Sequence, residues 1–139
     1  MTALNFFRRT CGDWTSERRY LFAPKLKPVN MTTEFKIEEL PSGIFQVAWS
    51  GNTEGVMELT IEGQTLHRSR DYFGSDANSS QIEVVDSDCI VLRTQYDGCR
   101  FREEVRLIES DMFRLRQTVG YNLNTGQLVL AGQYFETRL

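Results

Sequence analysis

The sequence has few of the residues that build metal or redox sites. Its 139 residues contain one histidine, His67, and three cysteines, Cys11, Cys89 and Cys99, without a CxxC pair. A single histidine without a cysteine cluster argues against zinc, so we expect no metal. The odd cysteine count and the lack of an apolar leader-like segment after Met1 favour free thiols in a reducing intracellular compartment, such as the cytoplasm.

Two further shortages limit the class of protein. No apolar run approaches the ~20 residues of a membrane helix. The net charge of −3 argues against nucleic acid as a partner. Lysine is also scarce, since only three of the sixteen basic residues are lysines. The surplus of arginine suits a partner with carboxylates or phosphates, although genomic base composition explains it as well.

Short segments with period-two alternation fill most of the chain. The length allows one domain, residues 1–139, with a single core. Turn residues separate the segments, which predicts consecutive β-strands. Ten strands joined by tight turns predict an all-β, antiparallel, up-and-down β-barrel, because closure removes the sheet edges. The predicted strands are 14–23, 32–39, 43–50, 55–61, 64–71, 81–86, 89–96, 100–108, 111–119 and 127–138.

The segment before the first strand has a helical pattern. Residues 3–11 place Leu4, Phe7 and Cys11 on one stripe, and Gly12 is expected to end the helix. We expect this short helix to plug one end of the barrel. The longest loops are expected near 24–31 and 72–80, at the rim.

Alternation assigns the strand residues to faces. Arg114, Arg116 and Thr118 share one face of their strand, with Phe113 and Leu115 on the other. If the arginine face points inward, Phe113 and Leu115 point outward. An exposed apolar pair of this kind suggests a subunit interface or a contact patch for another protein.

Charged residues on other strands allow two interpretations. Arg100, Arg102, Glu104 and Arg106 share a face, and such charge-rich faces usually meet water. Arg18 and Glu136 instead have apolar neighbours on their faces, which favours an inward orientation. An inward charge must pair or meet a ligand, because leaving it unpaired costs several kcal/mol.

A barrel interior of this composition suits a flat, conjugated acid. Arginines bind carboxylates, an interior carboxylate accepts from N–H groups, and aromatic rings cover a planar body. A linear tetrapyrrole has all three features, but the residues alone do not single it out from other flat acids. The candidate aromatic walls are Trp14, Trp49, Tyr72, Phe73 and Tyr134.

Four stretches, in order along the whole chain, resemble the S-type phycobiliprotein lyases of the CpcS/CpeS kind. Residues 6–18 resemble the family's FF…GxWxSxR opening, and 66–72 its L-x-R-x-x-x-Y segment. Residues 103–118 resemble its EER…LRLRTS segment, and 133–138 its closing FCSEIR. The resemblance implies a lipocalin-like (calycin) barrel, in agreement with the strand pattern.

The resemblance also implies roles for individual residues. Glu104 and Glu136 correspond to acidic residues that face the pyrrole nitrogens and act in catalysis. The resemblance assigns bilin binding to the arginines, to Trp49 and to the hydroxyl of Thr118. Trp14 and Tyr134 are added to the predicted bilin-binding residues as aromatic walls, on the residue pattern described above. The implied arginines are Arg18, Arg114 and Arg116.

The implied reaction joins a bilin, phycocyanobilin or phycoerythrobilin, to a cysteine of a phycobiliprotein α or β subunit by a thioether bond. The bilin is then a substrate, and no tightly bound cofactor is expected. A homodimer, or a heterodimer with a related lyase subunit, is compatible with the family. Two alternatives remain open: a non-catalytic lipocalin-like carrier of a flat or fatty acid, and a non-catalytic partner subunit of a heterodimeric lyase.

Overall fold

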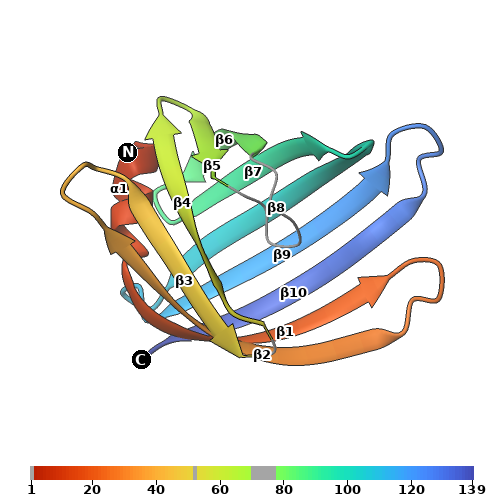
Figure 1. The fold of residues 1–139 in the computed structure, drawn as a ribbon, viewed down its shortest axis with the longest axis horizontal. Helices are drawn as coiled ribbons and strands as arrows, with labels where there is room; N and C mark the ends of the chain where they lie inside the picture. Colours follow the sequence, from red (N-terminus) through yellow and green to blue (C-terminus); the bar gives the residue numbers. More distant parts are fainter. Residues whose placement is uncertain (1, 52, 70–77) are drawn as a thin grey trace.

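Ten antiparallel strands close into a barrel behind one short helix, in a computed structural model that describes residues 2–51, 53–69 and 78–139 (Figure 1). Each strand pairs with its neighbours in sequence, and β1 pairs with β10 to close the ring. The predicted up-and-down barrel is therefore confirmed. The elements are α1 (Ala3–Arg9), β1 (Gly12–Phe22), β2 (Pro28–Glu39), β3 (Phe45–Gly51), β4 (Gly55–Glu62), β5 (Thr65–Arg68), β6 (Asn78–Asp86), β7 (Cys89–Tyr96), β8 (Cys99–Ile108), β9 (Phe113–Asn122) and β10 (Leu128–Arg138).

The loop predicted at 24–31 is shorter than expected. β2 already begins at Pro28. Proline has no backbone N–H to donate to the ladder, but it is tolerated at the first residue of a strand. Of the second predicted loop, residues 78–80 belong to β6, and 72–77 lie outside the described residues.

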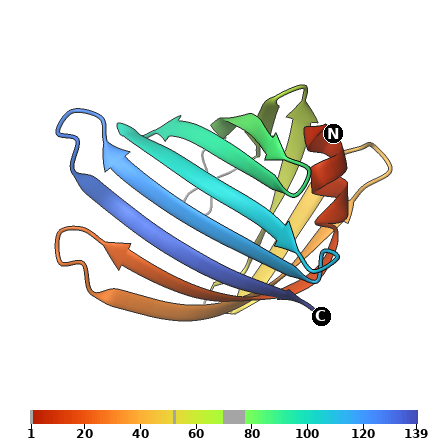
Figure 2. The same cartoon turned by 180° about the vertical axis from the view of Figure 1, so that it is seen from behind.

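Helix α1 and both chain ends lie at one end of the barrel, and the β1–β2 and β9–β10 turns lie at the other (Figures 1 and 2). The helix spans 3–9, slightly shorter than predicted. The threonine at its start, Thr2, accepts a hydrogen bond from Asn5 N through its side chain, as N-caps do. At its other end Arg138 donates to the carbonyls of Arg9 and Cys11, which satisfies groups that a helix end leaves unpaired.

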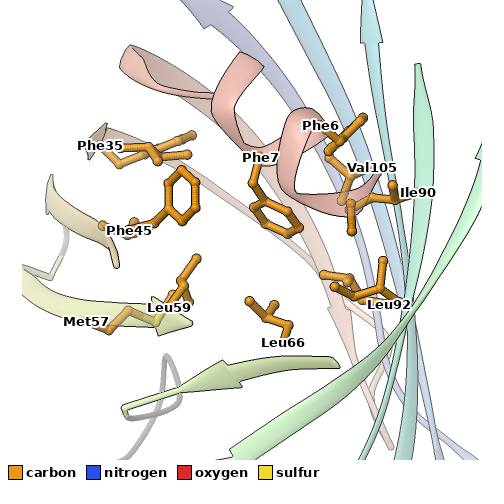
Figure 3. Close-up of a cluster of buried hydrophobic side chains, with 14 of the residues drawn as sticks. Phe6, Phe7, Phe35, Phe45, Met57, Leu59, Leu66, Ile90, Leu92 and Val105 are labelled. Atoms are coloured by element: carbon orange, nitrogen blue, oxygen red, sulfur yellow. The ribbon is translucent and has the colours of Figure 1, made fainter. Parts of the chain in front are cut away.

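The helix plugs its end of the barrel with two phenylalanines. Phe6 is 1% exposed, and the ring of Phe7 lies next to that of Phe45, with the two centroids 6.2 Å apart (Figure 3). Inward side chains from eight strands complete this apolar core, which therefore occupies the half of the barrel next to α1. They include Phe35, Met57, Leu59, Leu66, Ile90, Leu92, Val105 and Leu107.

Candidate functional site

Polar side chains form the next inward-facing layer, farther from α1 than the apolar core. On β1 the inward residues run from Trp14 through Ser16 to Arg18, moving away from the helix. On β9 they run from Arg114 through Arg116 to Thr118. The register pairs Arg18 with Tyr134 and Arg114 with Glu136, so β10 lies between these two strands. Alternation along three neighbouring long strands thus brings the polar groups together.

Glu136 is the centre of this layer and is fully buried. Arg114 Nε donates to Glu136 Oε1 at 2.6 Å, and Arg116 Nη2 donates to Oε2 at 3.2 Å. Burial would raise the pKa of Glu136, but Arg114 and Arg116 outweigh it, helped by the Ser16 hydroxyl, and hold the pKa at about 2. The carboxylate is therefore ionised at neutral pH and enclosed by its partners.

Glu103 lies on β8, on the other side of Arg116. Its carboxylate accepts from Arg116 Nη1 at 3.3 Å and from the Thr118 hydroxyl at 3.5 Å. The side chain is 19% exposed, whereas that of Glu136 is 0% exposed. Of these two inward carboxylates, Glu103 is thus the one that a ligand can reach.

Arg18 is the cation in this group with the longest ion pair. Its Nη2 lies 4.0 Å from Glu136 Oε2, and its Nε donates to Ser16 Oγ at 3.0 Å. The side chain is 12% exposed. Since Glu136 is held more closely by the other two arginines, Arg18 keeps capacity to bind an anionic ligand.

Aromatic rings lie beside these charges. The guanidinium of Arg116 lies 4.4 Å from the ring centroid of Tyr134, and that of Arg18 lies 5.3 Å from it. Tyr20 meets Tyr134 edge-on, with centroids 5.4 Å apart. Burial raises the pKa of Tyr134, so its phenol stays protonated. The layer thus combines carboxylate-binding groups with flat apolar surface.

The expected inward placement of Glu104 is wrong. Glu104 lies on the outer face of β8, 3.8 Å from Arg102, because alternation turns neighbouring residues to opposite faces. It lines an open groove of about 930 Å³ together with Leu115 and Phe135, and the lining of this groove also includes the inward residues Arg18, Arg116 and Tyr134. The outward orientation predicted for Leu115 is confirmed. The acid of β8 that points inward is Glu103. The sequence contained a signal for it, since alternation places Glu103 on the same face as the apolar Val105.

The two tryptophans take different positions. Trp14 is fully buried, stacks on Phe35 and donates from Nε1 to the Thr10 carbonyl at 2.9 Å. It packs behind Arg114, whose guanidinium lies 5.5 Å from its ring, and does not line an accessible surface. Trp49 is 9% exposed and lies across Gly55, where a Cβ atom would fall 2.5 Å from its ring.

The other sequence features lie apart from this layer. Tyr72 and Phe73, suggested as walls, lie outside the described residues. His67 is half exposed, 3.8 Å from Glu62. The described residues contain no group of three or more His, Cys, Asp or Glu side chains that could hold a metal. No described helix is long and apolar enough to cross a membrane.

Comparison with known proteins gives matches along the chain. Residues 57–139 match the model of the CpeS-like protein family. The chain is 26% identical, over 96% of its length and 80% of the relative's, to CpcV of Picosynechococcus sp., a candidate chromophore lyase. It is 28% identical, over 98% of its length and 90% of the relative's, to CpcS 2 of Nostoc sp., a candidate phycocyanobilin lyase.

A solved structure has the same fold. The S-type phycobiliprotein lyase CPES from Guillardia theta superposes with a TM-score of 0.74 at 15% sequence identity. The superposition covers 100% of this chain and 93% of that one. At this identity the likeness supports the barrel with its N-terminal helix, as predicted.

Proposed function

This chain belongs to the CpeS-like protein family, and we propose that it is a chromophore lyase of the CpcS/CpeS type. Its substrate in this proposal is a linear tetrapyrrole, phycocyanobilin or phycoerythrobilin. Its product is a thioether between that bilin and a cysteine of a phycobiliprotein subunit. The names of the relatives CpcV and CpcS 2 support a lyase.

The observation that supports this function most is the inward polar layer around Glu136. Arg18 and Arg116 offer guanidinium groups to a propionate, next to the flat ring of Tyr134. Trp49 supplies a second aromatic wall, and Thr118 a hydroxyl. A linear tetrapyrrole has propionates and a conjugated body, and so matches both parts of the layer.

The two inward carboxylates receive different roles. Glu103 is the acid that we place against the pyrrole nitrogens, where its charge favours the protonated and more electrophilic bilin. Glu136 is surrounded by Arg114 and Arg116, and its low pKa makes it a poor proton donor. We therefore assign Glu136 the role of positioning the arginines. Glu104, on the outer face, receives no role in catalysis.

The transfer step is the addition of a thiol to an alkene. The acceptor sulfur forms a bond to the ethylidene carbon, the C=C π-bond breaks, and the thiol proton ends on the tetrapyrrole. The barrel contributes by holding the bilin in one orientation toward the acceptor, which is a proximity effect. The acceptor subunit, a second lyase subunit and the cytoplasmic or plastid location all belong to this proposal.

The test is an absorption experiment on the purified chain with phycocyanobilin or phycoerythrobilin, followed by an apo-phycobiliprotein subunit. We expect a red-shifted, sharpened band that becomes covalent, and hence resistant to acid denaturation, on the acceptor. Binding without transfer would point to a carrier or to the non-catalytic partner of a heterodimer. Absence of any spectral change with either bilin would contradict the proposed function.

A further inference from the structure

We propose that Arg68, with Asn78 and the hydroxyls of Ser80 and Thr94, forms a second carboxylate-binding position inside the barrel. It faces the Arg18 and Arg116 side of the same interior. The inference rests on the proposed function and extends it, because it requires a substrate with two carboxylates, each bound by its own position inside the barrel.

The position of Arg68 follows from alternation on the short strands. On β5, Leu66 is a core residue and Arg68 is the next residue on the same face. On β6 and β7 the same step leads from the core residues Ile82 and Leu92 to Ser80 and Thr94. These three strands therefore continue the polar layer beyond the apolar core.

This part of the layer lies across the barrel from Glu136. In the ring order of the strands, β5 is the fifth neighbour of β10 in either direction. A ligand that contacts both β5 and β10 therefore spans the interior. Arg68 and Arg116 approach such a ligand from opposite walls.

Contacts hold the guanidinium of Arg68 in a defined orientation. Its Nη1 donates to Ser80 Oγ at 2.6 Å and to Asn78 Oδ1 at 3.1 Å. Ser80 is 1% exposed, and its hydroxyl is hydrogen-bonded to that of Thr94. Both side-chain bonds use the same nitrogen. Within the described residues, Nε and Nη2 have no hydrogen-bond partner, so one edge of the fork is available.

Arg68 also differs from Arg114 and Arg116 in the charge of its partners. Arg114 and Arg116 both pair with Glu136. Arg68 has no carboxylate within ion-pair distance among residues 2–51, 53–69 and 78–139; its two partners, Asn78 and Ser80, are neutral. Holding a partly buried cation without a counter-charge is unfavourable, and an anionic ligand would remove that cost.

The ligand class follows from the two positions. An acid with one carboxylate, such as a fatty acid, would satisfy one side only. A linear tetrapyrrole carries two propionates, which allows one to meet Arg18 and Arg116 and the other to meet Arg68. The free N–H edge of Arg68 matches a carboxylate through two parallel hydrogen bonds.

The test compares phycocyanobilin with its propionate dimethyl ester in absorbance titrations of the wild type and Arg68→Gln. We expect Arg68→Gln to weaken binding of the diacid about tenfold or more, the size of a lost charge-assisted hydrogen bond. Affinity for the diester should not change. Arg68→Lys keeps the charge but not the fork, so we expect an intermediate loss; this variant decides the question if Arg68→Gln does not fold.

Arg93→Gln is the matched control, because Arg93 is a half-exposed arginine on β7 that pairs with Glu83 at 2.6 Å. It should bind both compounds as the wild type does. Equal losses for diacid and diester in the Arg68 variants would show a structural role and overturn the proposal, as would no loss for either. If the wild type binds and transfers bilin while the Arg68 variants match it, only this second position fails. If the wild type binds no bilin, the proposed function fails with it.

Discussion

Glu136 shows how one buried residue organises the polar half of the barrel. A carboxylate with no exposed surface is stabilised there mainly because Arg114 and Arg116 bind both of its oxygens. Removing its charge would leave these cations without their central partner. The stability of the barrel and the geometry of the site therefore depend on the same residue.

We predict that Glu136→Gln lowers the free energy of unfolding by about 3–5 kcal/mol, as expected when one partner of a buried ion pair is removed. Urea denaturation measures this change. Glu38→Gln is the control, since Glu38 is exposed and lies 3.6 Å from Lys36; it should cost less than ~1 kcal/mol. Similar, small losses for both variants would contradict the organising role of Glu136.

The same carboxylate predicts a dependence of stability on acid. The folded pKa of Glu136, about 2, lies below its ordinary value of 4.5. A depressed folded pKa adds stability at pH values above the ordinary pKa, and this stability is lost as the pH falls toward the folded value. We expect the wild-type advantage over Glu136→Gln to shrink between pH 4.5 and pH 2 in urea titrations. A constant difference across that range would contradict the assignment.

Individual site residues were predictable where alternation decided them. Arg114, Arg116 and Thr118 share the inward face of β9, as their spacing indicated. The inward placement expected for Glu104 was wrong because the family motif contains two adjacent acids. Only the alternation of the strand, in which Glu103 shares a face with buried Val105, shows which of the two points inward. The support that Trp14 gives to Arg114 was not predictable, because it depends on the packing of α1 against β1 and β2.

At the scale of elements, all ten strands were predictable because turn residues separate period-two segments. The errors concern ends. β2 begins at Pro28, and β9 continues to Asn122, three residues beyond the prediction. Sequence patterns at strand ends are weak, whereas pairing with a neighbouring strand, here Leu21 with Pro28, fixes them in the folded chain.

Helix α1 is the element whose role can be tested alone. Phe6 is nearly fully buried in the apolar core, so Phe6→Ala should cost about 3–5 kcal/mol in unfolding free energy. Asn5→Ala, at an exposed position of the same helix, is the control and should have a small effect. Because Phe6 lies in the core and not in the polar layer, bilin affinity of the folded variant should remain near that of the wild type. A large loss of affinity with little loss of stability would contradict this division.

The described part of the barrel interior contains an apolar core next to α1, a polar layer beyond it, and a smaller apolar cluster of Tyr20, Leu130 and Tyr134 that borders this layer. Because the strands form a closed ring, each side chain on β8 points either into the barrel or out of it. Glu103 faces Arg116 and Thr118 inside, and Glu104 faces Arg102 outside. These neighbours have the same chemistry, and only their side of the barrel differs.

The most direct test of a bilin site inside the barrel is therefore a phycocyanobilin absorbance titration of Glu103→Gln and Glu104→Gln. Both variants lose one negative charge from the same strand, so net charge cannot explain a difference between them. We predict that Glu103→Gln changes the position of the bound-bilin band and weakens binding, while Glu104→Gln titrates like the wild type. A larger effect of Glu104→Gln would place the pigment near the outer face of β8, and equal effects of both would show no preference for the inner carboxylate. Either result would contradict a bilin site inside the barrel.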